Sequence, residues 1–272
     1  MKKTIAPTLL LLTFLVNLNT ACKKNSAAGD DVEKETVLSK IYENDILVDE
    51  FIYNSNKQLK KHILKLGNSY EEYKYDNNGY LVEINKFNSE GSPQKSYHYE
   101  NDENGRPLIM ELIALVEFPE PTLTDRVQYH YDAEGRIIKE SWLDPDGSEE
   151  IKYSNITWNE NGTLQKYEAF DNEGPVPVLT QLYEFSQDTD IPPAVLKIQG
   201  YPVNPGFAKF YAKKIRIVNY LAGEISNDNE EKFSDRLYDD NGILLGQKST
   251  TTYFKPVKPD SNRDFTFEYT EL

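Results

Sequence analysis

The sequence is poor in side chains that bind metals or form cross-links. Its 272 residues include one cysteine and three histidines. One cysteine cannot form a disulfide within the chain, a thiolate zinc cluster or an iron–sulfur site. We therefore expect neither a metal ion nor a cofactor.

Positive charge is also scarce. The chain has 30 Lys and Arg residues against 45 Asp and Glu residues, a formal net charge of −15. Without Lys2 and Lys3, which belong to a predicted leader, 28 basic and 45 acidic residues leave a net charge of −17. Binding to nucleic acid depends on Lys and Arg that neutralise phosphates, so we expect no nucleic-acid partner.

Catalytic signatures are missing as well. The sequence has no G-x-S-x-G elbow, no phosphate-binding glycine loop and no H-E-x-x-H motif. A carboxylate pair for glycoside hydrolysis could exist among 45 acids, but no spacing singles one out. Catalysis therefore stays open, and a hydrolase acting on glycans through an unidentified carboxylate pair is the alternative to a binding protein.

Long hydrophobic runs are absent, and the one short run lies near the N-terminus. Residues 1–22 read MKKTIAPTLLLLTFLVNLNTAC, in which two lysines precede an apolar stretch and small residues precede Cys22. The stretch is too short for a permanent membrane span and is typical of a secretion signal. It resembles a bacterial lipoprotein signal, which implies that residues 1–21 are removed and that Cys22 is lipidated. Acyl chains would then hold the protein on a membrane.

The segment after Cys22 is polar and has no hydrophobic periodicity. We interpret residues 22–36 as a flexible tether and residues 37–272 as one domain. The acidic tether favours an anchor in the outer membrane, with the domain facing either the periplasm or the cell exterior.

The rest of the chain repeats one short pattern. An aromatic residue, any residue and a second aromatic are followed by Asp or Asn, two polar residues, Gly, any residue and an aliphatic residue. The pattern occurs, with some variation, in YKYDNNGYL (73–81), YHYENDENGRPL (97–108), YHYDAEGRI (129–137), ITWNENGTL (156–164) and LYDDNGILL (237–245). A second glycine follows 12 residues after Gly79, Gly135 and Gly162.

This pattern predicts β-hairpins. The Asp side chain accepts backbone N–H groups in a turn, and Gly takes the positive φ that closes a short hairpin. Alternating aromatics place side chains such as Tyr73 and Tyr75 on one face of a sheet. We expect an all-β fold, an antiparallel meander of roughly 12 to 14 strands of about seven or eight residues that forms a curved or partly closed sheet.

Two stretches interrupt the pattern. Residues 113–125 contain a longer, proline-containing connection, and residues 186–211 hold four prolines among aromatics. Such proline density excludes a central strand. Irregular insertions often carry function, so the candidate ligand-binding residues of this insertion are Tyr201, Phe207, Phe210 and Tyr211. The alternative is a loop that caps one end of the sheet.

The segments YKYDNNGYLVEINKF and YHYDAEGRIIKESW resemble YD repeats, the β-hairpin units of RHS-type proteins. Their position behind a lipoprotein signal is similar to small Gram-negative surface lipoproteins of unknown function. The resemblance implies a curved or porin-like antiparallel sheet. It implies no catalytic residue.

We expect a binding or scaffolding role, with a glycan or an envelope or host protein as the ligand. Tyr73, Tyr75, Tyr129 and Tyr131 could form an exposed aromatic platform, but strand alternation predicts equally well that they form the core. His98 and His130 occupy the same position of two repeats and belong to the pattern, whereas His62 is isolated. We expect the Asp-rich turns to bind no calcium and the predicted strands to be too short to cross a bilayer.

Overall fold

The computed structural model describes residues 36–272, except 117–119, 161, 173, 188–211 and 241–242. Residues 35–272 form one compact unit. The predicted leader, Cys22 and most of the predicted tether lie outside the described residues. Within the described part, no helix has the length and apolar character needed to cross a membrane.

The described residues form sixteen β-strands. These are β1 (Thr36–Glu43), β2 (Ile46–Tyr53), β3 (Leu59–Leu64), β4 (Ser69–Tyr75), β5 (Leu81–Asn88), β6 (Pro93–Asn101), β7 (Pro107–Ala114), β8 (Thr122–Tyr131), β9 (Ile137–Leu143), β10 (Glu150–Trp158), β11 (Leu164–Asp171), β12 (Val178–Gln187), β13 (Ala212–Leu221), β14 (Glu224–Tyr238), β15 (Leu244–Lys255) and β16 (Val257–Glu271).

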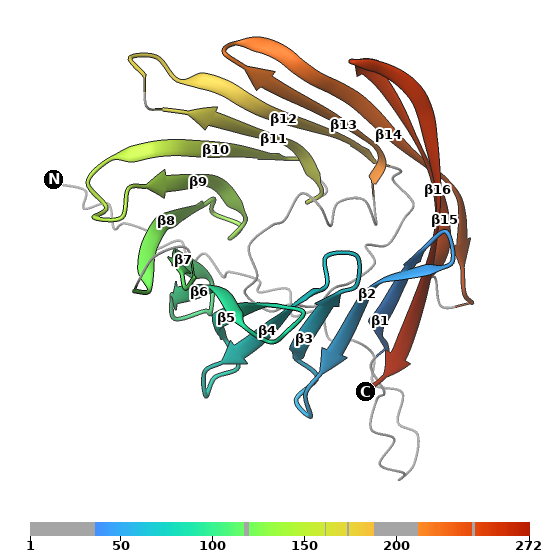
Figure 1. The fold of residues 1–272 in the computed structure, drawn as a ribbon, viewed down its shortest axis with the longest axis horizontal. Coiled ribbons are helices and arrows are strands. Elements are labelled where there is room, and N and C mark those ends of the chain that lie inside the picture. Colours follow the sequence, from blue (N-terminus) through green and yellow to red (C-terminus); the bar gives the residue numbers. More distant parts are fainter. Residues whose placement is uncertain (1–35, 117–119, 161, 173, 188–211, 241–242) are drawn as a thin grey trace, which may run out of the picture. The chain divides into compact units, whose positions relative to one another are not determined.

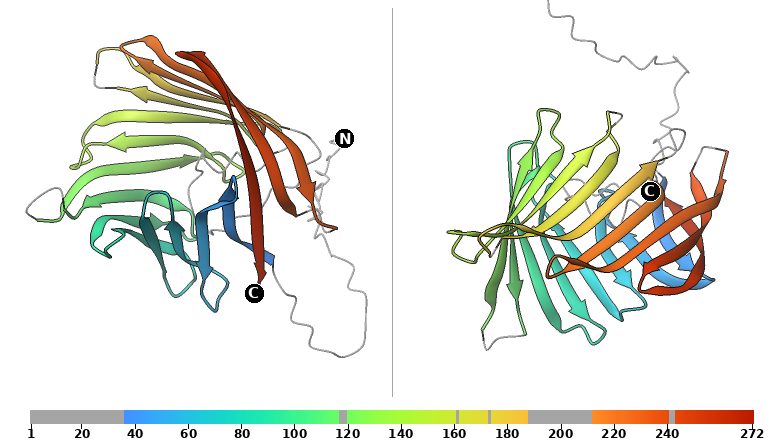
Figure 2. Two further views of the ribbon diagram at one scale, coloured as in Figure 1. Left: turned by 45° about the vertical axis from the view of Figure 1, so that its right-hand side comes forward. Right: turned by 90° about the horizontal axis from the view of Figure 1, so that it is seen from above.

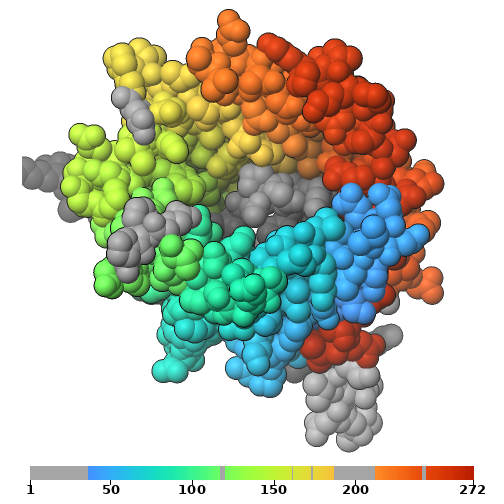
Figure 3. Space-filling view, viewed as in Figure 1, coloured from blue at the N-terminus to red at the C-terminus, as the bar shows by residue number. Residues whose placement is uncertain are grey.

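Each strand pairs antiparallel with its neighbours in sequence, and the sheet closes into a barrel (Figure 1). Closure is made by β1 and β16, which pair from Thr36 opposite Glu271 to Glu43 opposite Phe265. The space-filling view shows the first strands (blue) directly beside the last (red) (Figure 3). The predicted all-β antiparallel meander is confirmed, and the sheet closes.

The predicted strand number was too low, because several turns lack glycine. In the β1–β2 turn the residues with positive φ are Asn44 and Asp45, and in the β2–β3 turn it is Lys57. The lengths also differ from the prediction, since β14 and β16 have 15 residues each. Figure 2 shows these long strands running beside the shorter ones.

The repeated Asp-x-x-Gly segments form the predicted hairpin turns. In the β4–β5 turn, Asp76 Oδ1 accepts the N–H groups of Asn78 at 2.9 Å and Tyr80 at 2.8 Å. Gly79 has a φ of 85° and donates its N–H to the Asp76 carbonyl. The same contacts recur at Asp102 and Asp132. The carboxylates of these aspartates therefore stabilise the turns by accepting backbone N–H groups.

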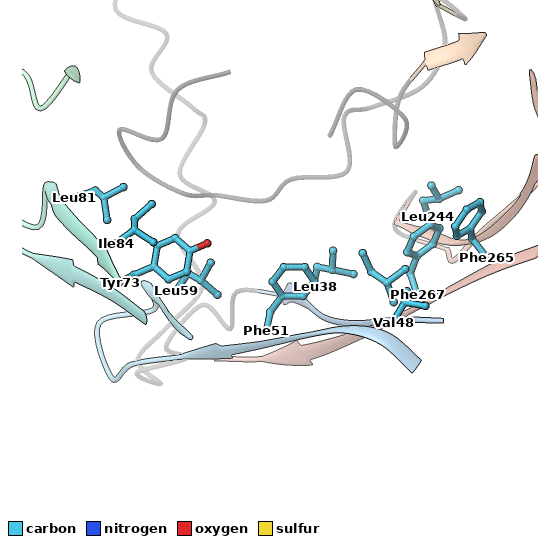
Figure 4. Packing of buried hydrophobic residues seen from close by; sticks show 11 residues of the cluster. Leu38, Val48, Phe51, Leu59, Tyr73, Leu81, Ile84, Leu244, Phe265 and Phe267 are labelled. Carbon is cyan, nitrogen blue, oxygen red and sulfur yellow. The ribbon is translucent and has the colours of Figure 1, made fainter. Parts of the chain in front are cut away.

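The inner face of the sheet carries the apolar side chains. Figure 4 labels ten of them, which project from one side of β1–β5, β15 and β16. A second buried cluster continues on the same face through β7–β14, with members such as Val127, Leu164 and Phe233. Tyr97 and Tyr99 of β6 pack against both clusters and so connect them across the inner face.

The outer face carries paired charges. Cross-strand ion pairs join Lys40 to Glu268 at 2.7 Å and Lys74 to Glu83 at 2.7 Å. Further pairs on this face are Lys61–Glu72, Arg126–Glu111, Lys139–Glu150 and Lys214–Glu230. Strand alternation thus separates an apolar face from a charged one.

Candidate functional site: a charged hollow on the outer face

A wide hollow lies on the outer face over β10–β14. It has a volume of about 960 Å³, and its lining includes Lys166, Glu184, Lys214, Arg216, Glu230 and Phe254. We call it the charged hollow. Its residues come from five strands and from the end of β15, so it exists only in the folded sheet.

Strand register arranges four of these side chains in a row. Lys166 of β11 lies opposite Glu184 of β12, Glu184 lies opposite Arg216 of β13, and Arg216 lies opposite Glu230 of β14. Neighbouring strands are about 4.8 Å apart, so the row places positive and negative groups alternately at that spacing. The hollow therefore offers hydrogen-bond donors and acceptors in alternation.

Hydrogen bonds hold Arg216 in place. Its Nε and Nη2 donate to Asp228 Oδ1 at 3.1 Å and Oδ2 at 3.0 Å, and its Nη1 lies 3.7 Å from Glu184 Oε2. Asp228 is only 7% exposed. The hydrogen bonds that Arg216 donates to Asp228 raise the pKa of Arg216 further above its usual value. The guanidinium is thus fixed before any ligand arrives.

Glu230 is held in the same way by two lysines. Lys214 Nζ lies 2.9 Å from Glu230 Oε2, and Lys232 Nζ lies 3.2 Å from Oε1. Burial alone would raise the pKa of Glu230, but hydrogen bonds from the two lysines outweigh it and lower the pKa. Glu230 therefore stays a carboxylate, which accepts hydrogen bonds but cannot act as a general acid.

A second polar cluster lies on the inner face, around His62 of β3. Its Nε2 lies 2.9 Å from Asp49 Oδ1, its Nδ1 lies 3.7 Å from Glu71 Oε2, and its ring stacks on Phe51. Burial lowers the pKa of His62, but the hydrogen bonds to Asp49 and Glu71 outweigh burial and raise it. This cluster could not be found from the sequence, because its members come from three strands, β2, β3 and β4.

A third feature is the buried carboxyl group of Glu140 on β9. Tyr167 donates to Glu140 Oε2 at 3.2 Å, and the Tyr167 and Ser154 hydroxyl oxygens are 2.7 Å apart. Burial raises the pKa of Glu140 to about 7. Its register partners, Tyr129 and Ser154, place it on the inner face.

The raised pKa of Glu140 does not serve the charged hollow. Glu140 is on the inner face, whereas Glu184 and Glu230 are on the outer face of the same sheet. Acid–base hydrolysis of a glycoside needs two carboxyl groups on one substrate, one of which holds a proton. Among the described residues, the carboxyl group whose pKa burial raises therefore lies on the opposite face of the sheet from the hollow.

The tyrosines of the repeats form the core. Tyr73 and Tyr129 are 7% and 6% exposed, and Tyr75 and Tyr131 are half-buried on the inner face. The hydroxyls of Tyr75 and Tyr131 donate to the carbonyls of Leu59 at 2.8 Å and Pro107 at 2.5 Å. The interpretation as an exposed aromatic platform is wrong for these four residues.

The other candidate residues stand as follows. His98 and His130 lie on the outer face, each with its Nε2 against a serine hydroxyl. The predicted lipidation site and ligand-binding residues lie outside the described residues; these are Cys22, Tyr201, Phe207, Phe210 and Tyr211. Across the part of the chain that the structure describes, no group of three or more His, Cys, Asp or Glu side chains could hold a metal ion.

Comparison with known proteins identifies the fold. A porin-like protein from Bacteroides uniformis superposes with a TM-score of 0.53 at 10% sequence identity, over 86% of this chain and 95% of that chain. A porin-like protein from Bacteroides vulgatus gives a TM-score of 0.49 at 11% identity, over 88% of this chain and 100% of that chain. No family model matches the sequence, and no curated protein is similar to it. The first superposition shows a shared fold and nothing more.

Proposed function

We propose that the protein is a lipid-anchored envelope protein of the YD-repeat type that binds a ligand in the charged hollow without transforming it. The observation that carries the proposal is the row of fixed, alternating charges in a hollow of about 960 Å³. Polar groups in fixed positions orient a ligand in a concave site, and the hollow holds Arg216 and Glu230 in place by hydrogen bonds and ion pairs. The ligand classes that fit are a glycan or an envelope or host protein.

The charged outer face supports anchoring by lipid over insertion of the sheet. A sheet that crosses a bilayer turns an apolar band toward the lipid. Here the outward face carries ion pairs such as Lys40–Glu268 and Lys74–Glu83. Attachment through Cys22 would leave this face in water, where the hollow is accessible.

The anchor is tested by fractionating cells that express the wild type or Cys22→Ala. The wild type is expected in the outer membrane and the variant in the soluble fraction. Protease added to intact cells then locates the domain: digestion places it outside the cell, and protection until the outer membrane is opened places it in the periplasm. A Cys22→Ala protein that stays with the membrane would contradict the lipid anchor.

Binding at the hollow is tested separately by crosslinking from its rim on the same cells. A photo-crosslinking amino acid replaces Thr157, which lines the hollow, and in a control it replaces Leu66 in the β3–β4 turn. A crosslinked species is expected from position 157 only. Equal crosslinking from both positions would contradict a role for the hollow.

A further inference from the structure

We propose that the ligand of the charged hollow is an uncharged glycan, whose hydroxyl groups bridge Glu184 and Arg216 and whose ring face lies on Phe254. This inference rests on the proposed function of the same site and names its ligand class. It follows from the charge balance, the alternation and the one exposed aromatic ring of the hollow.

The charge balance disfavours a charged ligand. Lys166, Lys214 and Arg216 contribute three positive groups, and Glu184, Asp228 and Glu230 contribute three negative ones. An anionic ligand that approached a lysine or arginine of the row would also approach the neighbouring carboxylates, which repel it. A cationic ligand that approached a carboxylate would likewise be repelled by the neighbouring lysine or arginine. A neutral ligand binds without separating any of these pairs, so it avoids the penalty of leaving a partly buried charge unpaired.

The alternation suits a molecule that carries many hydroxyl groups. A hydroxyl donates one hydrogen bond and accepts others, so a single group can accept from Arg216 and donate to Glu184. These two side chains lie opposite each other on β12 and β13, and both are partly exposed. Neighbouring hydroxyls on a sugar ring could repeat this contact along the row from Lys166 to Glu230.

Phe254 supplies the apolar contact. Its side chain is 49% exposed at the end of β15, where Lys255 pairs with Asp228. An aromatic ring presents a flat apolar face with electron density that attracts the C–H groups of a sugar. Phe254 lies beside the row of charged side chains and not within it. One sugar ring can therefore contact Phe254 with its face and the charged side chains with its hydroxyl groups.

A protein partner fits the hollow less well. The buried core of a protein interface is depleted in Lys, Glu and Asp and is enriched in aromatic residues, Met and Arg. The lining of the hollow differs from this composition, because it has two lysines, three acidic residues and one exposed aromatic ring beside a single arginine. The composition thus favours a glycan among the two ligand classes.

The inference is tested with the full chain purified in detergent and applied to immobilised polysaccharides. The uncharged probes are starch, mannan, xylan and a mixed-linkage β-glucan, and the charged probes are polygalacturonate and chondroitin sulfate. Binding to at least one uncharged probe is expected. Its affinity should change less than about twofold between roughly 0.1 and 0.5 M salt, because no net charge is neutralised on binding.

Two variants and two matched controls locate the site. Phe254→Ala and Glu184→Ala are each expected to weaken binding about tenfold, the effect of losing about 1.4 kcal/mol of contact energy. The controls are Leu66→Ala, an exposed apolar residue in the β3–β4 turn, and Glu72→Ala, whose carboxylate pairs with Lys61 on the outer face. All four side chains are partly exposed, so none of the four substitutions should unfold the protein. Both controls are expected to bind within about twofold of the wild type, because neither residue lines the hollow.

The outcomes separate this inference from the proposed function. If only charged polysaccharides bind, or if no polysaccharide binds while position 157 still crosslinks a protein, the glycan assignment is wrong and binding at the hollow stands. If an uncharged glycan binds equally well to all four variants, the glycan site is elsewhere. If no polysaccharide binds and position 157 crosslinks nothing, both proposals fail.

Discussion

The inner and outer faces of the barrel are formed by the same strands but differ in the side chains that they carry. On the inner face, residues such as Leu164 and Val127 are completely or almost completely buried, and polar groups are grouped around His62 and Glu140. On the outer face, charges are paired in register and the charged hollow lies open. The comparison shows that most of the buried apolar side chains lie on one face of the sheet, whereas the other face carries most of the paired charges.

The largest expected effect comes from the inner face. Leu164→Ala should lower the free energy of unfolding by about 3 kcal/mol, because Leu164 is 0% exposed and its removal leaves a cavity. Ile52→Ala, at a partly exposed position of the outer face, should change it by less than about 0.5 kcal/mol. Urea unfolding followed by tryptophan fluorescence measures both. Equal losses would remove the distinction between the faces.

Most substitutions of buried residues lower the free energy of unfolding, but substitution of Glu140 should raise it at high pH. Its folded pKa of about 7 exceeds the usual value of 4.5 for a glutamate, so the folded state loses stability as pH rises from 4.5 through 7. Glu140→Gln should therefore stabilise the protein at pH 8.5 by about 2 kcal/mol and have little effect near pH 4.5. Unfolding curves at both pH values test this. Glu83→Gln, on the outer face, is the control and should give no gain at pH 8.5.

His62 should also make stability depend on pH. Its folded pKa is raised, so the contribution of its protonated form is fully present below 6.5 and is lost as pH rises through the folded pKa. The stability difference between the wild type and His62→Gln should therefore be larger at pH 5.5 than at pH 8.5, by about 1.5 kcal/mol. Unfolding curves of both proteins give the difference. A constant difference would mean that the ring contributes by packing alone.

The smallest expected effect is that of an outer ion pair. Lys74→Ala removes the partner of Glu83, and the Lys74 side chain is 59% exposed. Exposed ion pairs stabilise proteins by about 0.3 kcal/mol and are screened by salt. Thermal unfolding should show a small decrease at low salt and none at 1 M salt. A loss of stability comparable to that of Leu164→Ala would contradict the conclusion that the inner face contributes more to stability than the outer ion pairs do.

Local chemistry explains why much of the fold could be predicted. The turns at Gly79, Gly105, Gly135 and Gly162 depend on residues a few positions apart, and all four glycines have the positive φ that the pattern required. Two of the three second glycines, Gly91 and Gly147, share this conformation. Closure could not be predicted, because it depends on pairing between residues at opposite ends of the chain.

The charged hollow could not be predicted for a related reason. Its row joins Lys166, Glu184, Arg216 and Glu230 through three registers, and β-bulges such as the one between Asn219 and Tyr220 shift those registers. A shift of one residue would move a whole strand of side chains to the other face. Alternation similarly showed that the tyrosines share a face, but it could not show which face is buried.

The seam between β1 and β16 makes the order of the hairpins cyclic. Thr36 pairs with Glu271, so the two ends of the described barrel are neighbours. A permuted chain, joined there by a short linker and opened between Ala222 and Gly223 in the β13–β14 turn, would keep every strand pair. The same barrel could therefore begin at a different hairpin, because its architecture is set by which strands are neighbours and not by where the chain starts.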